Sequence, residues 1–307
     1  MKQGTAGQRN SGVTKAIVAA ILWGVSGTCA QFLFERRGVS PEWLVAIRLL
    51  TAGVVLLLFA SKRREKIFWI WGVKGEVIQL VIFSLLGMLA VQYTYFITIK
   101  YSNAATATIL QFTGPVIIML YLAVKNRTAP KGLENLALVF AVTGTFLLVT
   151  HGKFSELVIT VPALVWGLIS AMAVAFYSIQ PSRLLEKHSS VVVVGWGMLL
   201  GGIAISFVHP PWHISGDWDL AALGNTSFVI LFGTLVAFYL YMLSVKAIGA
   251  QSASLLASGE PLSATIISVF CLGVQYGAVE WFGSLLIIST VFLIVSTGRK
   301  AGPKAKD

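Results

Sequence analysis

The chain has 307 residues, of which 56% are hydrophobic and only 11% are charged, and its formal net charge is +11. A soluble domain carries about a quarter charged residues, so this composition excludes an ordinary soluble enzyme and predicts an integral membrane protein. The basic residues lie in short loops between apolar runs, which is typical of signals that orient membrane spans and argues against a nucleic-acid partner.

Apolar runs separated by polar breaks predict an all-α membrane protein with ten transmembrane helices. A helix needs roughly 20 mostly apolar residues to cross a bilayer. The apolar run after Lys15 is too long for a signal peptide, so we expect it to stay as the first span. In chain order the predicted spans are residues 13–34, 43–60, 77–99, 102–124, 133–150, 158–181, 191–208, 226–246, 250–273 and 280–297.

The distribution of lysine and arginine predicts that both chain ends lie in the cytoplasm. When the tail 1–12 and the basic tail 299–307 are placed inside, the 23 lysines and arginines divide very unequally between the two sides. Such a bias agrees with the positive-inside rule, whereas a missed or extra span would scramble it. The basic residues that do not fall inside are Arg36, Arg37, Lys100 and Lys153 on the outside and Arg48 within the membrane.

The stretch 95–149 recurs 146 residues later, without a gap, as 241–295. The repeat predicts two halves, residues 13–153 and 157–298, with five helices each. Because five is an odd number, the second half enters the membrane from the opposite side, and the halves are expected to be inverted repeats. Duplication retained only for stability is the alternative. Matching pairs are Tyr95 and Tyr241, Lys100 and Lys246, Pro115 and Pro261, Glu134 and Glu280, and Phe146 and Phe292.

Several short motifs occur in a characteristic order along the ten predicted spans. They are Leu22-Trp23-Gly24 in the first span, Val165-Trp166-Gly167 in the sixth, Arg48 in the second, Pro115 in the fourth and Glu260-Pro261 in the ninth. In this order, and over essentially the whole chain, they resemble the bacterial EamA-like transporters of the drug/metabolite transporter superfamily.

The resemblance implies a ten-helix bundle in the bacterial cytoplasmic (inner) membrane, with a central cavity lined mainly by spans 1, 3, 4, 6, 8 and 9. It also implies transport of small metabolites such as amino acids, often as export. Many relatives carry a Gly-Glu pair thirteen residues after the proline of spans 4 and 9. Here Thr128 and Val274 occupy the glutamate positions, so a role tied to that glutamate is not expected.

Ionisable side chains inside membrane spans are costly and therefore mark candidate functional sites. Glu260 lies near the middle of the ninth span, and its repeat partner is Gly114, so only one half carries the acid. Three roles are open: a proton-coupling carboxylate, a counter-ion for an amine-bearing substrate, or a structural acid bonded to neighbouring hydroxyls. Arg48 lies closer to the outer surface, where an anchoring or helix-pairing role competes with substrate contact.

Aromatic and amide side chains within the spans are the other candidates for the cavity. Trp23 and Trp166 occupy similar places in the first and sixth spans, where paired indoles can hold a planar or cationic substrate. Helix packing is an equally good explanation of both. Pro115 and Pro261 each remove a backbone hydrogen bond and are predicted to act as hinges. The full set of predicted cavity residues is Trp23, Tyr95, Gln111, Trp166, Tyr177, Tyr239 and Glu260.

We expect a secondary transporter that moves a small organic metabolite by alternating access, with protons as the candidate coupling ion and the lipid bilayer as its surroundings. Import of an organic cation such as choline is an alternative, and a non-transporting scaffold or a channel is an alternative of another class. No P-loop or hydrolase constellation is present, so no enzyme activity or cofactor is expected. All four histidines fall in predicted loops, which argues against an intramembrane metal site. Neither the substrate, nor the direction of transport, nor the oligomeric state follows from these patterns.

Overall fold

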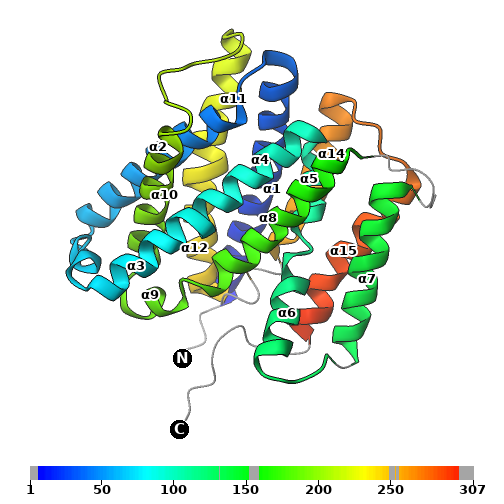
Figure 1. The fold of residues 1–307 in the computed structure, drawn as a ribbon, viewed down its shortest axis with the longest axis horizontal. Coiled ribbons are helices and arrows are strands. Elements are labelled where there is room, and N and C mark those ends of the chain that lie inside the picture. The colour runs from blue at the N-terminus through cyan, green and yellow to red at the C-terminus, as the bar shows by residue number, and fades with distance from the viewer. Residues whose placement is uncertain (1–5, 131, 152–158, 249–252, 254–255, 297–307) are drawn as a thin grey trace.

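The computed structural model describes residues 6–130, 132–151, 159–248, 253 and 256–296, and within these ranges the chain is helical with connecting loops and no strands (Figure 1). The helices of the N-terminal half are α1 (Ala6–Arg37), α2 (Pro41–Lys62), η1 (Trp69–Gly72), α3 (Lys74–Ile82), η2 (Phe83–Leu89), α4 (Ala90–Tyr101), α5 (Ala104–Gln111), α6 (Gly114–Lys125) and α7 (Leu133–Thr150). Those of the C-terminal half are α8 (Val161–Ile179), α9 (Ser182–Lys187), α10 (Ser190–Ser206), α11 (Leu220–Ile230), η3 (Leu231–Val236), α12 (Ala237–Ile248), α14 (Gly259–Leu272) and α15 (Ala278–Ser296).

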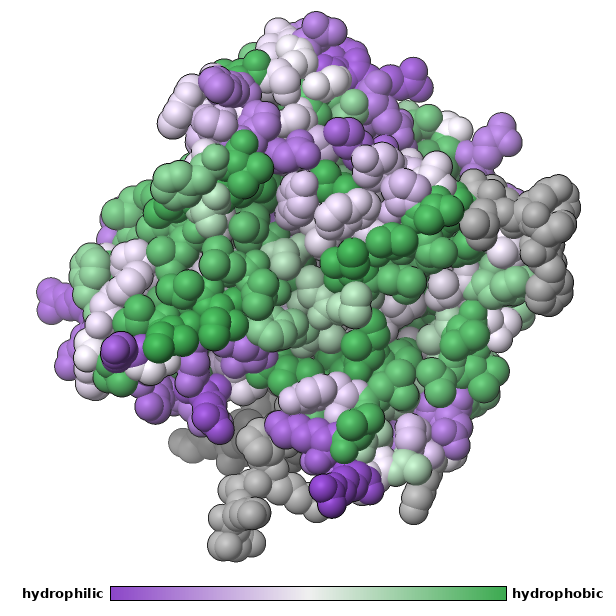
Figure 2. Space-filling model, in the orientation of Figure 1, coloured by the Kyte–Doolittle hydropathy of each residue, from purple (hydrophilic) through white to green (hydrophobic). Residues whose placement is uncertain are grey.

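Eight helical stretches within the described residues are long and apolar enough to cross a membrane, and α10 and α14 are shorter apolar helices. Figure 2 shows apolar side chains gathered across the middle of one face, with hydrophilic side chains toward both ends. This belt is what a bilayer requires of the surface in contact with its hydrocarbon. Helices overlap all ten predicted spans, but the crossing of all ten and the inversion of the halves stay predictions.

Polar caps explain where many of the spans begin. Each cap side chain accepts a hydrogen bond from the backbone N–H three residues further on, which satisfies one of the free donors at a helix start. One cap also accounts for a wrong boundary. The eighth span was expected from residue 226, yet α11 begins at Leu220 because the Asp219 carboxylate caps it. The capping residues are Ser40, Asn103, Thr160, Ser189 and Asp219.

Other boundaries differ by fewer residues, except in the first span, where α1 starts at Ala6 instead of 13. The predicted start of the ninth span at 250, the end of the tenth at 297 and the basic tail 299–307 lie outside the described residues.

The packing of the helices follows the 146-residue repeat. The two most extensive helix pairs are α2 with α10 and α7 with α15, and in each pair the members are repeat counterparts. Likewise α1 packs on α12 as α8 packs on α4. Gly53 lies so close to Leu199 that a Cβ on Gly53 would meet the Leu199 backbone nitrogen at 2.5 Å, and a Cβ on Gly202 would likewise meet the Leu50 backbone nitrogen at 2.8 Å. The two contacts correspond to each other at a spacing of 149 residues, so α2 and α10 pack on each other through equivalent positions.

Irregular backbone also occurs at equivalent places in the two halves. The π-helical turn η2 interrupts the third span, and η3 interrupts the eighth at nearly the equivalent position. The fourth span breaks at Phe112 and Thr113, just before Pro115, since proline lacks an N–H and clashes with the preceding turn. The equivalent of Phe112 is Ser258, where the helix is likewise interrupted. Inside a membrane such breaks are tolerated only where they face protein or a cavity.

Candidate functional site

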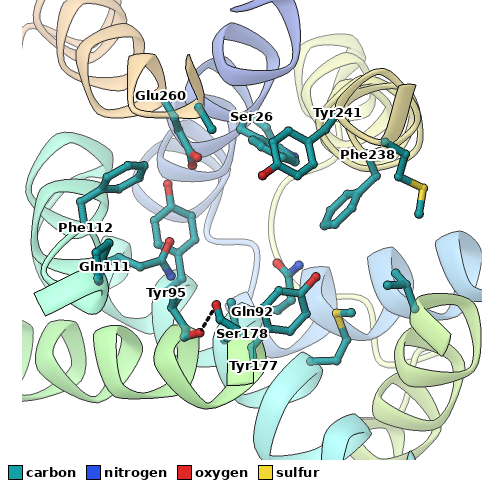
Figure 3. A pocket seen from close by; sticks show the side chains of 18 of the residues that line it. Ser26, Gln92, Tyr95, Gln111, Phe112, Tyr177, Ser178, Phe238, Tyr241 and Glu260 are labelled. Atoms are coloured by element: carbon teal, nitrogen blue, oxygen red, sulfur yellow. Dashed lines mark hydrogen bonds between the residues drawn. The ribbon is translucent and has the colours of Figure 1, made fainter. Parts of the chain in front are cut away.

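A cavity of about 510 Å³ lies at the centre of the bundle, between helices of both halves (Figure 3). Its volume suits a small organic molecule, since ligand pockets measure roughly 300–1,000 Å³. Most of the lining is apolar or aromatic, with a few polar groups among them. The polar and aromatic residues of the lining are Trp23, Ser26, Arg48, Gln92, Tyr95, Gln111, Phe112, Tyr177, Ser178, Ser190, Phe238, Tyr241 and Glu260.

Arg48 reaches the cavity from α2 and is held there by the π-helical turn η3. Its Nε donates a hydrogen bond to Thr234 Oγ1 at 2.6 Å, and its Nη2 donates to the carbonyl oxygen of Gly233 at 3.3 Å. The guanidinium carbon lies 5.3 Å from the centre of the Phe96 ring. A π-helical turn leaves carbonyl groups outside the usual bonding pattern, and here one of them accepts the arginine. The side chain therefore has a fixed position in a buried wall.

Glu260 enters from the first turn of α14 and lines the same cavity. In Figure 3 its carboxylate and the Tyr95 hydroxyl point toward the same part of the cavity. The Tyr95 hydroxyl is hydrogen-bonded to Thr108 Oγ1 at 2.8 Å. Among the described residues the carboxylate of Glu260 has no hydrogen bond and forms no ion pair, including with Arg48. An acid that faces a cavity without a partner is available to a ligand or a proton.

An aromatic cluster forms the wall opposite α5. The Trp23 ring centre lies 5.4 Å from that of Phe238 and 5.3 Å from that of Tyr241, which joins α1 to α12. Tyr177 of α8 stacks on Phe83 of η2 at 5.5 Å. These rings give the cavity flat apolar surfaces, with phenol hydroxyls at their edges (Figure 3). They suit an apolar group of a small substrate.

The two halves contribute unequally to the polarity of the cavity. Among the described residues Arg48 is the one arginine that lines the cavity, and the repeat partner of Thr234 is Met88, which lines the cavity as an apolar residue. The partner of Glu260 is Gly114, which packs against the α8 backbone near Ala171. Thus the charged side chains and the hydroxyl that orients Arg48 are present in one copy only.

Five of the seven predicted cavity residues line the cavity: Trp23, Tyr95, Gln111, Tyr177 and Glu260. Of the two predicted hinges, Pro115 also lines it, whereas Pro261 is buried in the first turn of α14. Gln111 donates a hydrogen bond to Ser170 Oγ at 2.7 Å, so this amide also joins α5 to α8. These placements concern location; the binding and hinge roles stay predictions.

Trp166 and Tyr239 do not line the cavity. Trp166 packs edge-on against Tyr93, and Tyr239 packs against Phe59 with 41% of its surface exposed. The two Trp-Gly motifs are 143 residues apart, three fewer than the repeat spacing. Three residues turn a side chain by about 60° around the helix axis relative to its expected place, which moves Trp166 out of the equivalent position.

Sequence reasoning undervalued Arg48 and left Tyr241 out of the final set. A signal for Tyr241 was present, because its repeat partner Tyr95 was chosen, whereas Tyr239 lies two residues away on the far face of the helix. No comparable signal existed for Arg48, since a π-helical turn in a distant span holds its side chain inward.

Comparisons with known proteins agree with this architecture. The model of the EamA-like transporter family matches the chain twice, over residues 10–150 and 161–296. The inner membrane transporter YicL of Salmonella typhimurium is 40% identical over 298 residues, covering 96% of this chain and 98% of that protein. The transporter YwfM of Bacillus subtilis is 24% identical, with 92% and 93% covered.

A solved crystal structure shares the fold with a TM-score of 0.63 at 17% identity, covering 92% of this chain and 96% of its own. With two matches to one family model and a relative of this identity along nearly its whole length, the chain belongs to the EamA-like transporter family of the drug/metabolite transporter superfamily.

Proposed function

We propose that this protein is a secondary transporter that moves a small zwitterionic metabolite, an amino acid or a similar compound, across the cytoplasmic membrane by alternating access. The observation that carries the proposal is the presence of Arg48 and Glu260 in one central cavity, unpaired with each other. A carboxylate and an ammonium group on one small molecule match this pair of charges. Family membership supports membrane transport of a small molecule.

Alternating access rests on ten spans in two inverted halves, with both chain ends in the cytoplasm. The double match of the family model and the packing of counterpart helices, α2 on α10 and α7 on α15, support this arrangement. The matching breaks near Phe112 and Ser258 give each half a point where a span can bend. With inverted halves, exchanging the two conformations opens the cavity on one side and closes it on the other.

The aromatic wall of the cavity supports a substrate with an apolar or aromatic side chain. With its charged groups between Arg48 and Glu260, the substrate places an apolar or aromatic group against Trp23, Phe238 and Tyr241. An organic cation such as choline fits less well, because Arg48 repels a positive charge in the same cavity. Export, the direction suggested by the family resemblance, and proton coupling through Glu260 complete the proposal.

Flux into proteoliposomes tests the proposal. Purified protein is reconstituted and loaded with unlabelled solute, and counterflow of labelled apolar and aromatic amino acids is measured beside labelled choline. We expect saturable counterflow of at least one zwitterion and none of choline. Counterflow of choline alone would instead support the alternative function, import of an organic cation. Failure of every amino acid with intact, correctly folded protein would reject the zwitterion assignment.

A further inference from the structure

The turn between α2 and α3 carries an unusual combination of exposed charge and exposed aromatic surface. We call residues 62–74 the basic aromatic turn. Phe68 is 68% exposed and Trp69 is 62% exposed, and Trp71 beside them is 37% exposed. The same stretch of the sequence carries five basic side chains against one acid, Glu65. The basic residues are Lys62, Arg63, Arg64, Lys66 and Lys74, all exposed and in no ion pair with another described residue.

The basic aromatic turn has a fixed shape. Trp196 of α10 donates its indole N–H to the carbonyl oxygen of Ile67 at 2.7 Å, and its ring contacts those of Phe68 and Trp71 at 5.7 and 5.0 Å. Ile70, between the exposed rings, is fully buried. The turn is therefore packed onto the bundle, and its rings face outward because the fold holds them there. A surface formed in advance loses little entropy when a ligand binds.

As a loop between two candidate membrane spans, the turn is expected at the level of the lipid headgroups. It joins the end of one candidate span, Lys62, to the start of the next, Lys74. Lys66 Nζ lies 4.6 Å from the centre of the Trp69 ring, so a cation and an apolar face are presented together. Amphipathic rings prefer this level of the membrane, and basic side chains there attract anionic lipids.

The repeat provides an internal comparison. The equivalent stretch of the other half, residues 208–220, contains no lysine or arginine and carries Asp217 and Asp219. It has its own exposed ring at Trp212, with 74% of its surface exposed. Both halves thus place an aromatic ring at a membrane edge, but one half alone adds positive charge. The basic cluster is therefore not a by-product of the duplicated frame.

We propose that the basic aromatic turn is a binding site for the headgroup of an anionic phospholipid, with phosphatidylglycerol as the simplest form of that chemistry. The phosphodiester accepts hydrogen bonds from Arg63 and Lys66, and the glycerol and upper acyl chains cover Phe68 and Trp69. A free phosphate ion satisfies the charges but leaves the rings in water, so a lipid is the better occupant. This inference rests on the membrane fold and holds whatever substrate is transported.

The test is a lipid titration of the full-length protein in nanodiscs of phosphatidylcholine with increasing phosphatidylglycerol. Thermal unfolding is followed for the unaltered chain, for Arg63→Gln/Lys66→Gln, and for the control Lys125→Gln/Arg127→Gln. The control removes the same charge from exposed positions at the end of α6 and just after it, at the same end of the bundle (Figure 1). Each lost contact is worth about fivefold in lipid affinity, so the first variant should need roughly 25-fold more anionic lipid for half of the stabilisation. The control should shift less than about twofold.

Two further observations complete the test. Added salt should weaken the effect on the unaltered chain, and millimolar inorganic phosphate should not replace the lipid. Equal shifts in the two variants would show diffuse attraction to the membrane and overturn the site. Full competition by inorganic phosphate would overturn the lipid assignment. Because the exchanged side chains are exposed, both variants are expected to unfold like the unaltered chain in pure phosphatidylcholine.

Discussion

The substitution Gly24→Ala tests whether close packing of α1 on α14 positions the acidic group of the cavity. A Cβ at Gly24 would lie 2.7 Å from the backbone nitrogen of Ala264 and 2.9 Å from the carbonyl oxygen of Glu260. It would also lie 2.0 Å from Ser263 Oγ. The serine side chain can rotate away, but the two backbone atoms move only with the helix. Ordinary contacts to carbon are about 3.5 Å, so α14 must retreat by roughly 0.6–0.8 Å.

Overpacking of this kind typically destabilises a protein by about 1–3 kcal/mol. Because the displaced carbonyl belongs to Glu260, the substitution should also lower transport of the substrate. The assays are thermal unfolding in detergent and counterflow in proteoliposomes. The matched control is Gly224→Ala in α11, where nothing lies within 4 Å of an added Cβ. That change should leave stability equal or slightly higher, because alanine favours a helix. Equal stability and transport in Gly24→Ala and the control would refute the packing argument.

Three further predictions concern single charged groups. Glu260→Gln should abolish the dependence of transport on a pH gradient. If the variant keeps the full dependence, Glu260 does not couple transport to protons. Arg48→Lys loses the Nε hydrogen bond to Thr234, and a hydrogen bond from a charged donor is worth about 1.5–3 kcal/mol. The affinity for a zwitterion should therefore fall roughly 10- to 100-fold. An unchanged KM would contradict binding of the substrate carboxylate by Arg48. The hydrogen bonds from Arg37 hold the pKa of the Asp219 carboxyl below its usual range. That ion pair therefore contributes stability above about pH 4 and loses it as pH falls through the lowered pKa. The stability difference between the unaltered chain and Asp219→Asn should be small at neutral pH, since Asp219 is exposed and Arg37 is partly exposed. It should vanish in acid; a difference that persists in acid would refute the ion-pair argument.

The overall helical design follows from the sequence because hydropathy acts over long segments. A run of twenty apolar residues has few alternatives to a membrane helix, and the repeat relates the two halves without further information. The ends of the helices depend on single side chains such as the capping residue Asp219. Hydropathy averaged over a window of many residues does not detect such a side chain. The π-helical turns were not predicted either, because η2 and η3 carry no proline, and the single glycine in each, Gly87 and Gly233, is common in membrane helices.

The candidate site was predictable to the extent that burial of charge is costly. Glu260 stood out because an acid in mid-membrane needs a reason. Arg48 was ambiguous, since a long side chain near a surface can turn outward, and only the position of η3 decides that it turns inward. Trp166 was misplaced because a motif was given more weight than its register.

The bond between Arg48 and η3 also bears on the resting state of an empty transporter. If the halves exchange conformations during transport, two identical halves would give two states of equal energy. Here Arg48 of α2 is hydrogen-bonded to Thr234 of η3, whereas the repeat partner of Thr234 is Met88, which offers no hydroxyl for such a bond. The two states then differ in free energy, and each difference of about 1.4 kcal/mol biases their populations tenfold. An unloaded transporter would therefore keep its cavity open mainly toward one side of the membrane. The two directions of transport would then start from unequal populations.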